Sequence, residues 1–338
     1  MLFGTISMYA ISALKKDTVG IDTLGYKRVY ESASQYSWGD FNYVYFEPGY
    51  ILLMKIFSQI GLSFQLFSAI IYAFIYLSFY QFVKRYSKDV TLSLLIYICY
   101  IFFVFNISGI RNAISIAICL YSFRLLEKSG VKSFIGFTLV VLIAYFFHNS
   151  AIIFFLVYYI MKAKITPFAA LGYIGGSLGL VIFRNYIYSF INTFIHGMGQ
   201  PGEISIGGNI ILLIGILIFS LISLYFINKT QVKNSKRLNY TQIGSNSTSP
   251  FDISMGCLKL LYVAIVVLLM TGQDDLSRSA MYLQVFIIIL LPNILQLFEI
   301  KSRILLKGLL VSFLIIFFYV TVLSVRQYDI VPYYFIWQ

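Results

Sequence analysis

The feature that most constrains this chain is a succession of apolar runs that recurs from one end to the other. Hydrophobic residues make up 59% of the sequence and charged residues 11%, whereas soluble domains carry about 25% charged residues. The runs of a length and composition that predict membrane-spanning helices are residues 64–83, 90–107, 112–126, 133–147, 149–161, 167–183, 209–227, 256–271, 279–297 and 308–324. The pattern therefore predicts an all-α polytopic integral membrane protein, with about 10–12 transmembrane helices joined by short loops.

The segments between these runs indicate one transmembrane domain covering residues 1–338. The first apolar run, residues 1–14, is shorter than the ~20 residues that a comfortable span requires. Residues 15–60 predict an extracytoplasmic polar loop followed by an interfacial amphipathic helix at 48–60, with Pro48 near its start. Residues 228–255 are rich in Ser, Thr and Asn and predict a flexible cytoplasmic loop.

The net charge of +12 orients the chain. Most Lys and Arg residues fall in alternate loops, at residues 84–88, 124–132, 162–164, 229–237 and 301–307. The positive-inside rule places these loops in the cytoplasm, so the basic excess needs no nucleic-acid partner. The same alternation places on the extracytoplasmic side the charged residues Asp22, Glu47, Arg111, His148, Arg184, Asp274, Asp275, Arg278 and Arg326.

Arg111 and His148 are the first candidates for a functional site. Arg111 opens one apolar run and His148 closes the next, with a short loop between the runs. Two antiparallel helices joined in this way bring both residues to one membrane face, and an ionisable residue in such a setting is a functional hypothesis by default. Arg111 could clamp a pyrophosphate, and His148 could transfer a proton or bind phosphate. The alternatives are an orienting arginine and a capping histidine.

A second set of candidates lies in the polar loop of residues 15–47. Asp22 and Glu47 are acids in a segment rich in Tyr, Trp and Gly, which includes Tyr26 and Trp38. Aromatic rings that stack on sugars, beside carboxylates that accept hydroxyl protons, suit carbohydrate binding. A solvated carboxylate is the simpler interpretation of either acid taken alone.

A third set precedes the run at 279–297. Arg278 could be a second cation for a diphosphate, with Asp274 and Asp275 contacting substrate, or Asp275 and Arg278 could simply cap a helix. His196 lies in the expected 185–208 loop and has no acid or cysteine at ligand spacing. The three cysteines lie in apolar runs without CxxC spacing. We therefore expect no metal, no cofactor and no disulfide framework.

Five segments, in this order, resemble the EpsG-like, Wzy-type family of bacterial polysaccharide polymerases: TVGIDTLGY, EPGYILLMKIF, GIRNAISIAICL, FFHNSAIIF and RSAMYLQVFIIILLP. The family usually has Arg where this chain has Lys15 and Lys16, and Arg-Gln where Arg111 is followed by Asn112. The resemblance implies an enzyme of the bacterial cytoplasmic membrane whose site faces outward. It would join oligosaccharide repeat units carried on undecaprenyl pyrophosphate, as in O-antigen, capsule or exopolysaccharide synthesis.

The candidate residues suit that reaction. Arg111 and Arg278 would stabilise the leaving pyrophosphate, Asp22 or Glu47 would be the base, and His148 would bind phosphate or relay the proton. The expected partners are the lipid-linked substrate, membrane lipids, a chain-length regulator and a flippase. A transporter of lipid-linked glycans, a related ligase, glycosyltransferase or acyltransferase, and a structural subunit remain alternatives at this point.

Overall fold

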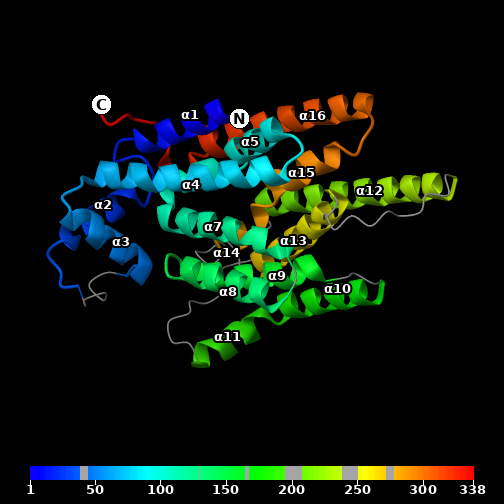
Figure 1. Ribbon diagram of the computed structural model, residues 1–338, viewed down its shortest axis with the longest axis horizontal. Helices are drawn as coiled ribbons and strands as arrows, with labels where there is room; N and C mark the ends of the chain where they lie inside the picture. Colours follow the sequence, from blue (N-terminus) through cyan, green and yellow to red (C-terminus); the bar gives the residue numbers. More distant parts are fainter. Residues whose placement is uncertain (39–44, 129, 164–166, 195–207, 238–249, 272–277) are drawn as a thin grey trace. The chain divides into compact units, whose positions relative to one another are not determined.

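The computed structural model describes residues 1–38, 45–128, 130–163, 167–194, 208–237, 250–271 and 278–338. Within these ranges the regular elements are helices, apart from one isolated antiparallel bridge between Lys15 and Phe335 (Figure 1). The expected all-α class is confirmed. The described residues form two compact units, one made of Met1–Ile152 with Leu291–Gln338 and the other of Ile153–Leu290. A single transmembrane domain stays a prediction.

The first unit carries the two ends of the chain. Its helices are α1 (Leu2–Ala13), α2 (Thr23–Ala33), α3 (Pro48–Gln59), α4 (Phe64–Tyr86), α5 (Val90–Cys99), α6 (Phe102–Ser108), α7 (Ile110–Ser122), η1 (Phe123–Glu127), α8 (Val131–Tyr145), α16 (Ile300–Phe318), the π-helical η4 (Tyr319–Ser324) and η5 (Gln327–Asp329). Two short elements, η2 (Asn149–Phe154) and α15 (Ile287–Leu295), cross the boundary between the units.

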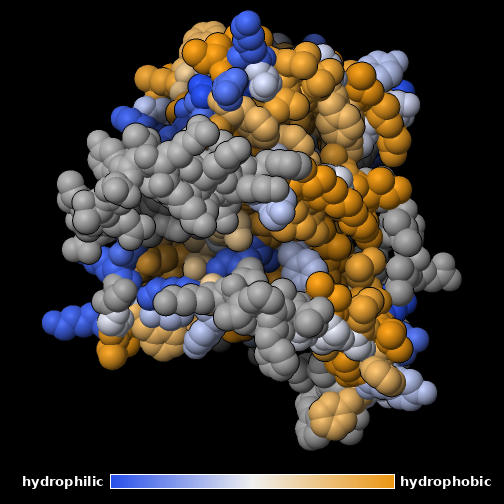
Figure 2. Space-filling view, turned by 90° about the vertical axis from the view of Figure 1, so that its right-hand side faces the viewer, coloured by the Kyte–Doolittle hydropathy of each residue, from blue (hydrophilic) through white to orange (hydrophobic). Residues whose placement is uncertain are grey.

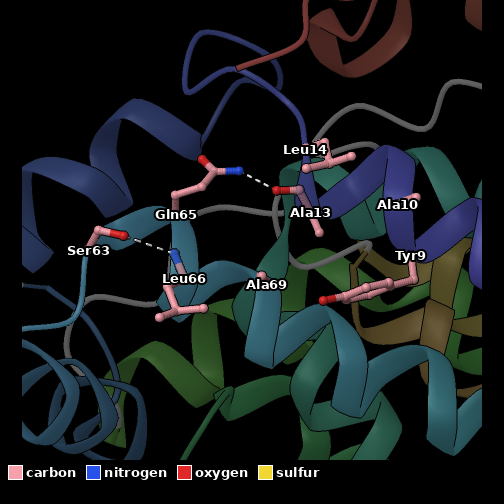
Figure 3. A pocket seen from close by; sticks show the side chains of 8 residues that line it. All are labelled: Tyr9, Ala10, Ala13, Leu14, Ser63, Gln65, Leu66 and Ala69. Atoms are coloured by element: carbon pink, nitrogen blue, oxygen red, sulfur yellow. Dashed lines mark hydrogen bonds between the residues drawn. The ribbon is translucent and has the colours of Figure 1, made fainter. Parts of the chain in front are cut away.

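Helix α4 is the central helix of the first unit. Both α1 and α7 pack against it, α8 packs against α7, and α5 packs against α16. The Ser63 hydroxyl caps α4 by accepting from the Leu66 amide at 3.3 Å. Figure 3 shows a small apolar pocket where the end of α1 meets the start of α4, with Gln65 bonded to the Ala13 carbonyl at its edge.

The small residues of α7 allow it to pack closely against α8. Ala113, Ser115 and Ala117 are all buried, and the Ser115 hydroxyl donates to the Ala144 carbonyl of α8 at 2.8 Å. Because none of these side chains is bulky, the two helix backbones can approach each other. This contact fixes the start of α7 beside the end of α8.

The second unit contains α9 (Phe155–Lys162), α10 (Pro167–Ile182), α11 (Arg184–Phe194), α12 (Gly208–Arg237), α13 (Pro250–Thr271) and α14 (Arg278–Gln284). Helix α13 is central, since α9, α10, α12 and α14 all pack against it. Lys259 of α13 donates to the Ala163 carbonyl at 2.8 Å. This bond gives a hydrogen-bond partner to a backbone carbonyl just after α9.

In the part of the chain that the structure describes, four helices are long and apolar enough to cross a membrane: Phe64–Tyr86, Ile253–Thr271, Arg278–Leu295 and Ile300–Ser324. The pair α5 and α6 makes a fifth span if the 53° bend between them is accepted as a break within one span. The last of the four is only 6% buried, as expected of a helix that faces lipid, and Figure 2 shows broad apolar areas on the visible surface. The chain is an integral membrane protein.

Among the described residues this count is lower than the ten to twelve spans expected, and that number stays a prediction. Four of the ten predicted runs fold as apolar helices of 10–17 residues, namely Val131–Tyr145, Asn149–Lys162, Gly172–Ile182 and Ile210–Tyr225, and so does the short first run, as Leu2–Ala13. The reason at residues 90–107 is a local break, because Tyr100 and Ile101 leave helical backbone angles. Uninterrupted apolar sequence therefore does not guarantee an uninterrupted helix.

Three expected loops are also corrected in part. Residues 23–33, expected in a loop, form α2, because Tyr26, Tyr30 and Ala33 are spaced to share one buried face. The expected 185–208 loop begins with α11, and its His196 lies outside the described residues. The expected flexible loop at 228–255 is helical at 228–237 and 250–255, where residues 228–237 contain neither Gly nor Pro to end α12. The expected helix at 48–60 is confirmed as α3, whereas its interfacial position stays a prediction.

Candidate functional site

The site is built where α7 begins and α8 has just ended. A buried helix, α6, leads to Gly109, and α7 starts at Ile110, so Arg111 occupies its first turn. Helix α8 ends at Tyr145 and His148 follows within three residues. The sequence predicted that Arg111 and His148 meet, and both side chains approach the carboxylate of Glu47.

Glu47 links the two candidates. Its Oε2 accepts a hydrogen bond from Arg111 Nη1, and its Oε1 accepts from the Asn149 amide at 3.3 Å. His148 Nδ1 lies 3.9 Å from Oε1. The side chains of Glu47, His148 and Arg111 are 9%, 13% and 17% exposed, so the ion pair is largely withdrawn from water, where charge interactions are strong and costly to break.

Gly49 explains how Glu47 reaches this position. Glu47 is the residue before the first turn of α3, with Pro48 starting the helix. The Gly49 amide donates to the Phe146 carbonyl at 2.8 Å. A Cβ on Gly49 would lie 2.7 Å from that same oxygen, so only glycine lets the start of α3 press against the end of α8.

Aromatic rings enclose the guanidinium. Arg111 Cζ lies 4.3 Å from the ring centroid of Phe46 and 5.6 Å from that of Tyr26. Its Nε also lies 3.5 Å from the Tyr26 hydroxyl. Tyr26 and Phe46 are tilted to each other and both pack edge to face on Tyr50, with centroids 5.5 to 6.0 Å apart. Each cation–π contact contributes about 0.5–2 kcal/mol, and together the rings restrict the cation to one orientation.

The tautomer of His148 follows from its local bonding. The Ser150 amide donates to His148 Nδ1 at 3.2 Å, so Nδ1 acts as an acceptor and the proton of the neutral ring sits on Nε2. A histidine held in this way can donate through Nε2 to a substrate oxygen. The bond from the Ser150 amide is a capping arrangement of the kind considered from the sequence.

Asp22 lies close to this cluster through α2. Its amide approaches the hydroxyl of Ser108, which is three residues before Arg111, at 3.4 Å. Tyr26, which contacts Arg111, lies one helical turn after Asp22 on α2. Asp22 is partly exposed, whereas Glu47 is buried. The two acids named from the sequence therefore differ, since only Glu47 is bonded to Arg111.

The loop before Asp22 holds a buried ammonium group. Lys15 Nζ donates to the Val19 carbonyl at 2.7 Å and to the Thr23 hydroxyl at 2.6 Å. Burial lowers the pKa of Lys15 to about 7, against a smaller opposing effect of Asp17. Lys15 is thus an internal support of the loop, which the sequence did not single out.

The remaining sequence candidates are not part of the cluster as described. Arg278 begins α14 in the second unit. Asp274 and Asp275 lie outside the described residues. Trp38 is 51% exposed and immediately precedes residues 39–44. Of the aromatic pair suggested for sugar binding, only Tyr26 contacts the cluster in the described structure.

Sequence reasoning missed the partner of Arg111. No acid lies near Arg111 in the sequence, and Glu47 is 64 positions away. It also missed Phe46 and the Asn149 amide. The aromatic residues around Glu47 and the HNS stretch at residues 148–150 can be read in the sequence. No spacing rule, however, predicts contacts between segments so far apart.

Among the described residues, no group of three or more His, Cys, Asp and Glu side chains could hold a metal ion. The expectation of a metal-independent reaction stays a prediction. The arrangement offers instead a fixed cation, a buried carboxylate that orients it and a histidine donor. Such a set can stabilise negative charge on a substrate.

The family follows from comparison with known proteins. The model of the EpsG family matches residues 1–335. The chain belongs to the EpsG family. Membership indicates polysaccharide biosynthesis by a polymerase of the glycosyltransferase kind, in agreement with the resemblance drawn from the sequence. Comparisons with curated proteins and with solved structures find no match.

Proposed function

We propose that this EpsG-family protein polymerises oligosaccharide repeat units carried on undecaprenyl pyrophosphate, at the outer face of the bacterial cytoplasmic membrane. The observation that carries the proposal is the buried Arg111–Glu47 pair beside His148, enclosed by aromatic rings. A fixed cation and a histidine donor suit a pyrophosphate leaving group. Aromatic rings beside a partly exposed acid suit a sugar.

In the proposed reaction, a sugar hydroxyl of one lipid-linked unit attacks the anomeric carbon of another. A new glycosidic C–O bond forms, and the bond from that carbon to the pyrophosphate oxygen breaks. The lipid pyrophosphate leaves with the electron pair, and the hydroxyl proton passes to a carboxylate. Arg111 stabilises the charge that develops on the leaving oxygen.

The environments of the two acids support different roles for them. Glu47 already accepts bonds from Arg111 and from the Asn149 amide, so it suits the orientation of Arg111. Asp22 is partly exposed and suits the base that receives the hydroxyl proton. His148 would donate through Nε2 to a phosphate oxygen. Arg278 as a second phosphate ligand, with Asp274, Asp275 and Trp38 as substrate contacts, stays a proposal from the sequence.

The histidine role makes a specific prediction. Glutamine places an amide N–H near the position of imidazole Nε2, whereas asparagine places one near Nδ1. We therefore expect His148→Gln to retain more activity than His148→Asn, by about tenfold. Equal loss in both variants, in single-turnover measurements, would argue for proton transfer by the imidazole itself.

The decisive experiment uses purified protein in lipid vesicles with a lipid-pyrophosphate-linked repeat unit. We expect wild type to produce a ladder of glycan lengths. Arg111→Lys should lose at least about 100-fold in rate, because an ammonium cannot reproduce the planar guanidinium contacts. Arg28→Ala is the control, because it removes an exposed cation from α2. This variant should still produce the ladder of glycan lengths.

Other products would identify the alternatives. Transfer of a single unit to a different acceptor would indicate a ligase. Movement of the lipid-linked unit across the bilayer without a ladder would indicate a transporter. A ladder unchanged in Arg111→Lys would leave a polymerase but remove Arg111 from its site. A chain-length regulator and a flippase are the protein partners we propose.

A further inference from the structure

The C-terminal segment lies along the loop that leads to Asp22. We name residues 327–336 the C-terminal strap and residues 14–22 the first loop. At one end of the contact, backbone bonds join Ile336 to the Leu14 carbonyl and Lys16 to the Tyr334 carbonyl, both at 2.9 Å. The isolated bridge between Lys15 and Phe335 belongs to the same contact.

At its other end the strap bonds the residues next to Asp22. The Gly20 amide donates to the Asp329 carbonyl at 3.0 Å, and the Ile21 amide donates to the Tyr328 carbonyl at 3.3 Å. The Tyr328 ring also packs edge to face on Phe105 of α6, with centroids 5.5 Å apart. The strap thus ties the first loop to the helix that leads to Arg111.

The backbone of the strap is strained where it makes these bonds. Tyr328 and Asp329 have φ of 68° and 50°, in the left-handed region that is unfavourable for a non-glycine residue. Such conformations persist only where the surroundings enforce them, and they cluster at functional sites. Here the strained residues are the two whose carbonyls receive the amides of Gly20 and Ile21.

The first loop needs these bonds where its backbone is buried, at Val19 and Gly20. Val19 is 1% exposed and Gly20 is buried with φ of +94°. A buried amide without a partner is costly. The opposite side of the loop is held by Gln65 of α4, whose side chain donates to the Ala13 carbonyl (Figure 3) and reaches the Lys15 carbonyl at 3.4 Å.

The loop in turn positions the candidate site. Asp22 ends the loop and precedes α2, which carries Tyr26 to the guanidinium of Arg111. The Asp22 amide approaches Ser108 on the segment that continues into α7. A displacement of the first loop therefore moves both Asp22, the proposed base, and Tyr26, one of the rings that contact the Arg111 guanidinium.

We propose that the C-terminal strap is a positioning element of the catalytic centre, acting through the carbonyls of Tyr328 and Asp329 on the loop that carries Asp22. The role in catalysis rests on the proposed polymerase function. The hold on the loop does not, because it concerns the backbone alone. The strap itself makes no chemical step.

Two substitutions at one exposed position separate backbone from side chain. Asp329→Pro fixes φ near −65° and so cannot keep the observed conformation. Asp329→Gly keeps positive φ accessible and removes only the carboxylate. We expect Asp329→Pro to lower kcat at least tenfold, with KM within about twofold, because a misplaced base slows the chemical step more than binding. Asp329→Gly should remain near wild type.

Hydrogen–deuterium exchange of the peptide covering residues 14–22 provides a readout without turnover. Exchange should be faster in Asp329→Pro and unchanged in Asp329→Gly, with the same amount of inserted protein in both. Unchanged exchange in Asp329→Pro would refute the hold on the loop. Faster exchange with an unchanged kcat would refute the catalytic role.

The remaining outcomes are equally informative. Activity lost in Asp329→Gly as well would point to chemistry by the carboxylate and overturn a purely backbone role. A wild type that makes no ladder would refute the polymerase proposal. The exchange measurement would still decide whether the strap holds the first loop.

Discussion

At the scale of single residues, the pair of Arg111 and Glu47 carries two roles that can be separated. Burial makes each charge depend on the other, since a lone buried charge is poorly tolerated. The same burial holds the guanidinium in one orientation, which suits the binding of a second anion. Stability and activity should therefore respond differently when the pair is removed together.

We expect Glu47→Gln or Arg111→Met alone to destabilise the protein by about 3 kcal/mol, because either leaves an unpaired buried charge. The double variant should recover part of that stability, since neither charge remains. Polymer formation should not recover, because the cation proposed to stabilise the leaving group is absent. Denaturation in detergent and the vesicle assay measure the two effects, and a double variant with restored activity would contradict the proposed role.

Lys15 gives a pH dependence with a definite sign. Burial lowers its pKa to about 7 in the folded protein, whereas an unfolded lysine titrates near ~10.4. Between these values the unfolded chain binds more protons, so folded stability rises with pH across that window. Below pH ~7 both states are protonated and this dependence ends.

We therefore expect wild type to gain thermal stability relative to Lys15→Met as pH rises from about 7 to 9. Taking the difference between the two proteins cancels groups that titrate in both. The midpoint of thermal unfolding in detergent is the measurement. A difference that is constant over this range would mean that Lys15 does not titrate there.

At the scale of elements, the site depends on how closely α3 approaches the end of α8. Gly49 is the contact point, and its neighbours are backbone atoms of Phe146 that cannot rotate away. Glu47 precedes this contact and His148 follows it. The spacing of the two helices therefore sets the distance between carboxylate and imidazole.

Gly49→Ala should separate these elements and cost about 1–3 kcal/mol, the usual range for an overpacked contact. Activity should fall more than stability suggests, because Glu47 shifts relative to His148 and Asn149. Gly25→Ala on α2 is the control, since a Cβ there meets nothing within 4 Å. It should leave activity intact and favour the helix slightly. Equal effects of both variants on polymer formation would contradict this view.

At the scale of the whole molecule, the first unit keeps apart the two faces expected from charge. Residues expected in the cytoplasm pair with one another, as Arg85 with Glu127 and Lys307 with Asp89, each at 2.6 Å. Of the residues expected outside, Glu47, Arg111 and His148 gather in one cluster. The side of the membrane on which each group lies stays a prediction.

Labelling of single cysteines tests that orientation. The native cysteines are buried, so they should add little background labelling. We expect Glu31→Cys on α2 to react with a membrane-impermeant maleimide in intact cells. Lys301→Cys at the start of α16 should react only after the membrane is opened. The reverse pattern would place the proposed site in the cytoplasm.

The sequence by itself determined the class of the protein, because apolar runs and the placement of basic residues act locally and additively along the chain. It also brought Arg111 and His148 to one place, since a helical hairpin between them leaves little freedom. It could not supply the length of each helix, because the apolar composition around Tyr100 and Ile101 does not mark the backbone break there.

Only the tertiary structure decided what Arg111 faces. Glu47, Phe46 and Tyr26 come from segments far from it in sequence, and their meeting depends on the contact of Gly49 with Phe146. The contact of the C-terminal strap with Gly20 and Ile21 spans almost the whole chain. Periodicity and composition record which residues prefer burial, but the partners of a buried charge follow from long-range packing that no local pattern encodes.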